Sequence, residues 1–220
     1  MKENFNACLA EVLKHEGGFT QIKSDPGNWT GGKVGVGALK GTNMGISAAA
    51  YPNENIKGMT RERAAAIYRR DYWDAVKGDD LPAGMDFVAF DGAVNSGASR
   101  GAKWLQAALG VTQDGKIGPA TLAAAGKADA GMVIDRACNA RLAFLRSLGT
   151  WPTFGKGWST RVEGVRATAK AMATPPRPAP KPVPVVDTIP ATAPSGPPTM
   201  TLIALVVFVA LLAVAIITKG

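Results

Sequence analysis

The 220-residue chain has few of the residues that build metal sites and disulfides. It contains one histidine and two cysteines, and it lacks both zinc-finger spacing and a glycine-rich phosphate loop. Cys8 and Cys138 lie among apolar residues of helical pattern, which favours small buried side chains over a disulfide. His15 is expected to be a helix-end residue rather than a metal ligand. We therefore predict an activity that uses no metal and no cofactor.

The N-terminus lacks a long apolar run, so no cleavable signal peptide is expected. Residues 202–217, LIALVVFVALLAVAII, carry no charge and with their neighbours approach the ~20 residues that span a bilayer. We predict a transmembrane helix over 199–218 and a lipid bilayer as partner, with a buried core helix as the alternative. The proline-rich residues 174–198 predict an extended spacer. A docking motif for a partner domain is the alternative there.

The formal net charge is +8, and most of it belongs to the part of the chain before the proline-rich segment. A basic globular domain suits an anionic polymer, such as nucleic acid, an acidic membrane surface or bacterial cell wall. The sequence shows neither an aromatic-basic RNA signature nor an evident recognition helix. Nucleic acid is therefore not expected as a partner.

Hydrophobic periodicity predicts a mainly α-helical soluble part with at most one short hairpin. The glycine-rich residues 24–47 are expected to form either that hairpin or a long ordered loop. Thr60 is expected to cap the second helix, and Pro119 to open a helix after an Asp-Gly turn. The predicted helices cover residues 3–16, 60–76, 85–110, 119–125, 131–148 and 158–172.

Glu16 stands out because it falls near the middle of the apolar stripe of the first predicted helix. Gly17 and Gly18 follow and are expected to end that helix. A carboxyl group facing the interior or a cleft wall loses solvation, so its pKa is expected to rise, as a general acid requires. The alternative is a buried glutamate paired with an arginine. The stripe consists of Phe5, Cys8, Leu9, Val12 and Leu13.

Three further polar residues are candidates for the site. Asp25 lies nine residues after Glu16 in a turn-rich loop and is a second carboxylate, although before Pro26 it also suits an Asx-turn. Asp91 and Asn95 lie beside the apolar face of the predicted helix 85–110. Buried polar groups need partners, so these two are expected to hydrogen-bond inside the domain or at a cleft floor.

Five short motifs occur in the order found in one enzyme family. They are EGG (16–18), DPG (25–27), GTNMGIS (41–47), DYW (71–73) and FDGAVNSGA (90–98). Residues 104–122 also look like that family's C-terminal peptidoglycan-binding segment, with the pattern LQ…LGV…DGKIGPAT. On these motifs, residues 9 to about 170 resemble glycoside hydrolase family 108, the N-acetylmuramidases of phages and bacteria.

The resemblance implies a lysozyme-like helical fold that cleaves the β-1,4 bond between N-acetylmuramic acid and N-acetylglucosamine in peptidoglycan. It implies a catalytic domain over 1–95 and a peptidoglycan-binding segment over 96–173 packed on it. Glu16 becomes the catalytic acid, and Asp25 the candidate that stabilises positive charge on the sugar. Residues 28–40 depart from the family pattern, which leaves their role open. The expected substrate-binding residues are Thr42, Tyr72, Trp73, Asp91 and Asn95.

Three functions compete on the sequence. The first is a membrane-anchored muramidase acting on the periplasmic side, for phage lysis, virion entry or secretion. The second is a lytic transglycosylase, which also relies on one glutamate but forms an anhydro-sugar without water. The third is a non-catalytic peptidoglycan-binding anchor, against which the intact Glu16 argues. The charges that flank residues 199–218 are too few to orient the helix, and the sequence gives no oligomeric state.

Overall fold

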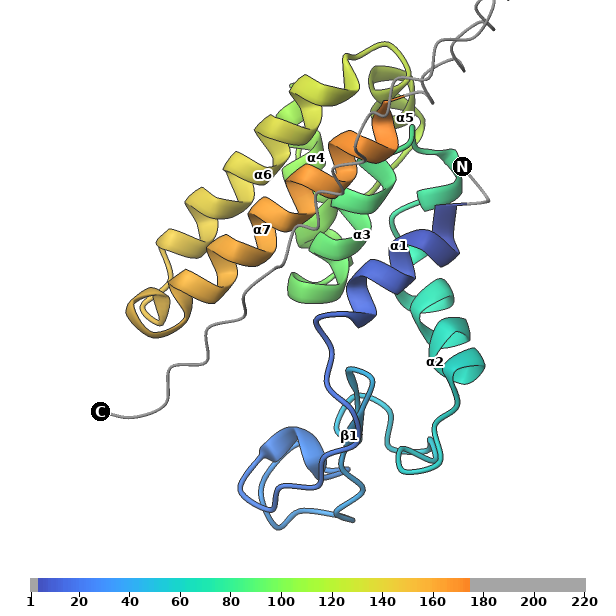
Figure 1. Ribbon diagram of the computed structural model, residues 1–220, viewed down its shortest axis with the longest axis vertical. Coiled ribbons are helices and arrows are strands. Elements are labelled where there is room, and N and C mark those ends of the chain that lie inside the picture. The colour runs from blue at the N-terminus through green and yellow to red at the C-terminus, as the bar shows by residue number, and fades with distance from the viewer. Residues whose placement is uncertain (1–3, 175–220) are drawn as a thin grey trace, which may run out of the picture. The chain divides into compact units, whose positions relative to one another are not determined.

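The structure, a computed structural model, describes residues 4–174 of the chain (Figure 1). The proline-rich spacer from residue 175 onward and the predicted transmembrane helix over 199–218 lie outside the described residues. None of the helices within 4–174 combines the length and the apolar character needed to cross a membrane.

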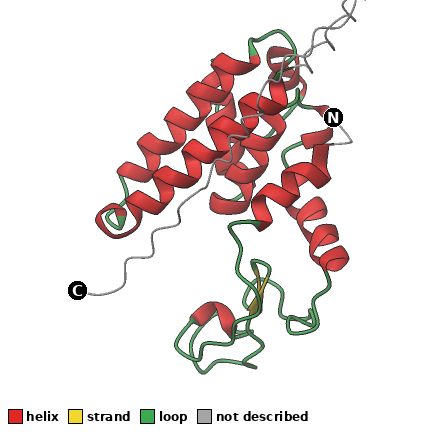
Figure 2. Ribbon diagram, viewed as in Figure 1, coloured by secondary structure: helices red, strands yellow, loops and turns green. Residues whose placement is uncertain are grey.

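Helices make up most of the described chain, as the hydrophobic periodicity predicts, and Figure 2 shows them gathered on one side of a loop-rich region. The last helix begins at Trp151 rather than 158, because Pro152 suits the first turn of a helix, where its missing N–H costs nothing. The helices are α1 (Asn4–Leu13), α2 (Arg61–Tyr68), α3 (Met85–Ser96), α4 (Ala98–Leu109), α5 (Pro119–Ala125), α6 (Ala130–Arg146) and α7 (Trp151–Ala173).

The predicted helix over 85–110 is wrong in one respect, because it is two helices that fold back on each other. The break is at Gly97, whose φ of 86° and ψ of 147° leave the helical region. The small residues on both sides permit the close packing expected from the sequence. A Cβ at Gly101 would lie 2.7 Å from the Ala89 carbonyl oxygen, so only glycine lets the α3 and α4 backbones meet.

The first helix also ends earlier than predicted, at Leu13 rather than Glu16. Lys14, His15 and Glu16 continue as a turn, in which the N–H of Glu16 donates to the Leu13 carbonyl at 3.3 Å. The second helix has the predicted cap, since the Thr60 hydroxyl accepts from the Arg63 N–H at 3.2 Å. It continues beyond Tyr68 as a π-helical turn over Arg69–Trp73.

Residues 24–47 form a long ordered loop with a minimal hairpin. Strands β1 (Thr42–Asn43) and β2 (Ile46–Ser47) pair antiparallel, with Thr42 opposite Ser47. Isolated bridges join Thr20 to Thr42 and Trp29 to Leu39. The buried Asn28 fastens the loop, because its amide donates to the Ile22 carbonyl at 3.0 Å and accepts from the Thr42 hydroxyl at 2.7 Å.

An aromatic core joins α1, the π-helical turn and α3. The Trp73 ring lies 5.3 Å from the Phe90 ring and 5.5 Å from the Phe5 ring, centroid to centroid, in edge-to-face contact. Cys8 and Cys138 are buried and unbonded to each other, as the sequence predicts. Burial raises the pKa of the Cys138 thiol to about 11, so the group stays protonated at neutral pH.

Candidate active site

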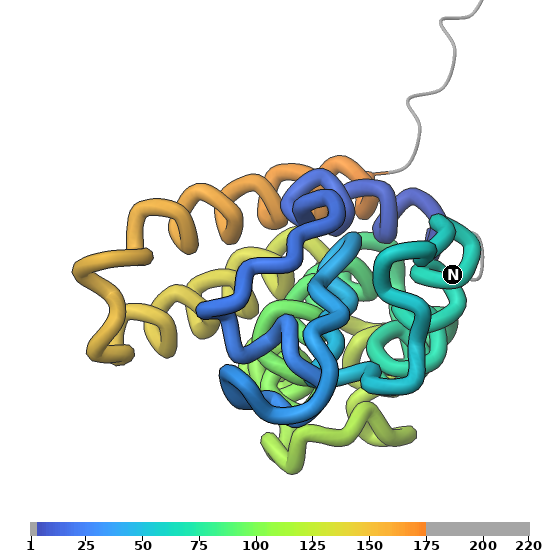
Figure 3. Tube along the Cα trace, turned by 90° about the horizontal axis from the view of Figure 1, so that it is seen from below, coloured from blue at the N-terminus to red at the C-terminus, as the bar shows by residue number. Residues whose placement is uncertain are grey.

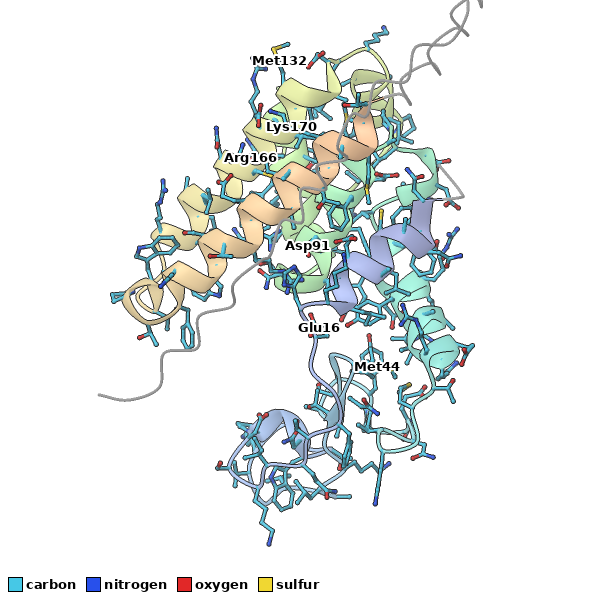
Figure 4. The ribbon with its side chains drawn as sticks, viewed as in Figure 1. Glu16, Met44, Asp91, Met132, Arg166 and Lys170 are labelled. Carbon is cyan, nitrogen blue, oxygen red and sulfur yellow. The ribbon has the colours of Figure 1, made fainter. Side chains whose placement is uncertain are left out.

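Glu16 lies where the helices meet the loop-rich region, with Asp91 on the helical side and Met44 on the loop side (Figure 4). Its side chain is 22% exposed. The loop approaches so closely that Gly45, at φ 75°, has no room for a side chain. A Cβ there would lie 2.8 Å from Glu16 Oε2 and 2.4 Å from the Tyr68 hydroxyl oxygen. The carboxylate is therefore accessible but closely bounded.

Tyr68 fixes the loop beside the carboxylate. Its hydroxyl donates to the Met44 carbonyl at 3.0 Å, and the N–H of Met44 donates to the Gly17 carbonyl at 3.1 Å. The Tyr68 ring also packs on Tyr72, with centroids 5.6 Å apart. Burial, and then the nearby charge of Glu16, raise the pKa of Tyr68 above its ordinary value. The hydroxyl therefore keeps its proton and holds the turn in place.

Arg161 reaches Glu16 from the opposite side, on α7. Its Nη1 lies 3.6 Å from Glu16 Oε1, whereas its Nη2 lies 2.8 Å from Asp91 Oδ2. The guanidinium is mostly buried. Burial opposes its charge, but Asp91 and then Glu16 raise the pKa of Arg161 above its ordinary value. Arg161 therefore connects a buried carboxylate to a partly exposed one.

Asp91 is fully buried and also accepts from Arg141 Nη1 at 2.6 Å. Burial would raise the pKa of Asp91, but Arg141 and Arg161 outweigh it and hold that pKa below its ordinary value. The Arg141 guanidinium in turn lies over the Trp104 ring, 5.6 Å from its centroid. Asp91 is thus a charged anchor for two arginines.

The expected substrate-binding residues do not form one surface. Trp73 and Asp91 have no exposed area and cannot contact a polymer directly in this structure. The prediction that they bind substrate is therefore corrected, and both belong to the core. Trp73 instead donates from Nε1 to Asp79 Oδ1 at 3.0 Å. Thr42 and Tyr72 are half-buried, and Asn95 is exposed near the end of α3. A substrate-binding role for these last three stays a prediction.

Asp25 lies on the exposed loop and caps the short 3₁₀ helix Pro26–Asn28. Its Oδ1 accepts from the Gly27 N–H at 2.8 Å, which is the Asx-turn that the sequence suggests. This bond accounts for an aspartate before a proline. Its part in the chemistry stays a prediction.

Sequence reasoning misses Arg141 and Arg161, although both leave a signal. Arg141 lies on the apolar stripe of α6, eight residues after Val133 and four after Ala137. Arg161 lies four residues before the buried Val165 on α7. A charged residue on an apolar helical stripe requires a buried partner of opposite charge. The sequence therefore predicts that each arginine pairs with a buried carboxylate, but it does not tell which carboxylate.

The loop-rich region also carries a hollow of about 440 Å³. Asn43 of β1 supports the hollow, because its amide donates to the carbonyl of the lining residue Ile56 at 3.1 Å. Five of the hollow's eight lining residues carry amide or ammonium groups, which can hydrogen-bond to the hydroxyls of a sugar. Within residues 4–174, no three histidine, cysteine or acidic side chains lie together as a metal site. The lining consists of Gln21, Leu39, Lys40, Asn53, Glu54, Asn55, Ile56 and Lys57.

A partly exposed glutamate whose surroundings fix its orientation can serve as a general acid, which glycoside hydrolysis requires. Comparison with known proteins agrees. Residues 9–97 match the family model described as glycosyl hydrolase 108, and residues 100–163 match a predicted peptidoglycan domain. A comparison with curated protein sequences found no match.

Among solved structures, the chain is similar to SagA of Brucella abortus. The identity is 42% over 80% of this chain and 99% of that chain, with a TM-score of 0.67. The chain belongs to the glycosyl hydrolase 108 family, and it is a glycoside hydrolase that acts on peptidoglycan. Glu16 and Asp91 fall in the first matched segment and Arg161 in the second, so both segments build the site.

Proposed function

We propose that the chain is an N-acetylmuramidase that hydrolyses the β-1,4 bond between N-acetylmuramic acid and N-acetylglucosamine. The observation that carries this proposal is the setting of Glu16, partly exposed and bounded by Gly45, Tyr68 and Arg161. The test is mass spectrometry of purified cell wall after digestion. Fragments with reducing N-acetylmuramic acid ends are expected. Cleavage on the other side of the muramic acid, or no release at all, would contradict the proposal.

The geometry supports Glu16 as the general acid that protonates the leaving oxygen. Arg161 lies 3.6 Å from the glutamate instead of forming a close bidentate pair, because Asp91 holds its Nη2 at 2.8 Å. The Tyr68 hydroxyl is likewise directed to the Met44 carbonyl. The Glu16 oxygens therefore remain available to a substrate at the junction, and the nearby protein groups keep the carboxyl in one orientation.

We assign Asp25 the second role, with its charge stabilising the oxocarbenium-like transition state. Asp25→Asn tests this, because the amide oxygen can still accept from the Gly27 N–H while the charge is lost. We expect turnover on purified wall to fall about 10²-fold at an unchanged melting temperature. Normal turnover would show that Asp25 acts only in the turn. Asp25→Ala, which also removes the cap, should additionally lower stability by about 1 kcal/mol.

A lytic transglycosylase is the second candidate, and one observation favours it. The Asp25 carboxylate accepts a hydrogen bond within its own turn, and the Asp91 carboxylate is paired with two arginines. A lytic transglycosylase relies on one glutamate, so it would need neither of them. Such an enzyme forms a 1,6-anhydro end instead of adding water. The same mass spectrometry separates the two, since anhydro products are lighter than hydrolytic ones by one water.

We propose further that residues 199–218 anchor the enzyme in a bilayer and that residues 174–198 act as a spacer. At about 3.1 Å per residue, an extended spacer of this length reaches many tens of ångströms. The site residues all precede the spacer. Deleting residues 175–220 should therefore leave a folded enzyme that cleaves purified wall, while only the full-length chain fractionates with membranes after carbonate washing. Soluble full-length chain, or a truncated chain that fails to fold, would refute the anchor.

For the cellular role we propose phage lysis, with the catalytic domain acting on the periplasmic side. Secretion and virion entry are the other settings in which an anchored wall hydrolase serves. Protease protection of cells carrying a tagged chain tests the orientation, because a periplasmic N-terminal tag is digested only once the outer barrier is opened. Protection that persists until the inner membrane is broken would contradict a periplasmic location.

A further inference from the structure

An exposed aromatic cluster lies at the start of α7, away from the contacts already described. The Trp158 ring lies 6.2 Å from the Trp151 ring and 5.7 Å from the Phe154 ring, centroid to centroid. Both tryptophans pack partly against the core, whereas Phe154 is 52% exposed. A Cβ at Gly155 would lie 2.6 Å from the Trp151 ring, so the missing side chain lets that ring lie against the helix. The cluster is therefore supported by the core on the side of the two tryptophans and exposed to solvent at Phe154.

The cluster leads along α7 to the catalytic carboxylate. At about 100° per residue, positions 151, 154, 158 and 161 fall within an arc of about 80° and form one ridge of the helix. At about 1.5 Å per residue the ridge is roughly 15 Å long. Its last member, Arg161, lies 3.6 Å from Glu16. Figures 1 and 3 both show the α6–α7 turn, where the ridge begins, projecting past the loop-rich region.

We propose that Trp151, Phe154 and Trp158 form an aromatic ridge that binds the glycan strand of peptidoglycan on its way to Glu16. Aromatic faces stack on the C–H faces of pyranose rings, and an indole N–H can donate to a hydroxyl or an N-acetyl carbonyl. A polymer of alternating amino sugars presents such faces repeatedly. The proposal rests on the glycan specificity proposed above, and it adds binding positions beyond the bond that is cleaved.

The position of the ridge favours a glycan strand over other occupants. A membrane surface or a second copy of the chain would need a wide apolar face, whereas this strip is narrow and continuous with the arginine that contacts Glu16. The Arg146 guanidinium lies 5.9 Å from the centroid of the Trp151 ring and adds a positive charge suited to the lactyl carboxylate that muramic acid carries where no peptide is attached. A strand lying along the ridge therefore meets stacking faces first and the acid last.

The test measures strand binding without turnover, in the full-length chain carrying E16Q and held in detergent micelles. The ligand is peptide-free strands of N-acetylglucosamine and N-acetylmuramic acid, and the signal is tryptophan fluorescence. Phe154→Ala should weaken strand binding about three- to tenfold, and Phe154→Trp should restore it. The matched control is Met132→Ala, since Met132 is 55% exposed but lies at the far end of α6 (Figure 4) and should change nothing.

Each other outcome of this test overturns the proposal. Equal strand binding by Phe154→Ala and the parent chain removes the ridge from glycan recognition. If Phe154→Ala instead weakens only sedimentation with anionic phospholipid vesicles, the ridge faces a membrane. If it only abolishes a dimer, the ridge faces a second copy. Strand binding is measured without cleavage. The result therefore tests the ridge even if the enzyme cleaves a different bond from the one proposed.

Discussion

Glu16→Gln should lower the rate of wall cleavage by about 10²–10⁴-fold or more, since the amide is nearly isosteric but cannot donate the catalytic proton. The fold should be unaffected. The side chain is partly exposed, and its contact with Arg161 is a long one at 3.6 Å. The measurement is turnover on purified wall together with the melting temperature. Activity within a few fold of the parent chain would remove Glu16 from the mechanism.

A matched control for this substitution lies on α7. Glu163 pairs with Arg166 at 2.9 Å at the surface, well exposed to solvent. Glu163→Gln makes the same chemical change without touching Glu16, Tyr68 or Asp91, so turnover should stay at the parent value. A comparable loss in both variants would indicate a general effect of charge on wall binding rather than proton transfer.

Asp91→Asn should have the largest effect on stability. The substitution leaves the buried Arg141 and Arg161 without the charge that compensates them, and breaking a buried pair in this way costs about 3–5 kcal/mol. Chemical denaturation measures the change in the free energy of unfolding. The control is Asp135→Asn, because Asp135 pairs with Arg166 and Lys170 in partly exposed contacts worth about 0–1 kcal/mol. Equal losses in the two variants would contradict the anchoring role.

The pH dependence of the same comparison has a defined sign. The arginines hold the pKa of Asp91 below its ordinary value in the folded chain. The stability it contributes is therefore complete above the unfolded carboxyl pKa of about 3.9 and is lost as the pH falls through the lower, folded value. The difference in unfolding free energy between the parent chain and Asp91→Asn should be constant near neutrality and narrow only in acid below about pH 4. If this difference in unfolding free energy already narrows near neutral pH, a group other than Asp91 causes the pH dependence.

Local features of the fold could be predicted from the sequence because they depend on neighbouring residues. The Thr60 cap, the helix opening at Pro119 and the capping turn at Asp25 each need only a few adjacent positions. The break at Gly97 is not evident from the sequence, because small residues on either side keep the helical period in phase across it. A glycine with positive φ is not distinguishable by sequence from one that lets two helices meet.

The candidate site could be predicted only in part, for a related reason. Glu16 could be identified because helical spacing puts it near the middle of the apolar stripe, although the helix itself ends three residues before it. Its partner Arg161 comes from the other end of the folded part, and helical periodicity carries no information on contacts at that separation. The burial of Trp73 likewise depends on Phe5 and Phe90, which belong to other helices.

The ion pairs that join Arg161 to Asp91 and Glu16 also set the point in synthesis at which the site is completed. A ribosome adds about 5–20 residues per second, so the arginine follows its glutamate by on the order of ten seconds. Until α7 has been made and has docked, Asp91 has Arg141 of α6 but lacks Arg161, and the wall of the site that α7 supplies is missing. A nascent chain, or one cut short before residue 161, carries Glu16 without all of the surroundings that orient it. The site is thereby completed only when nearly all of the folded part has been synthesised.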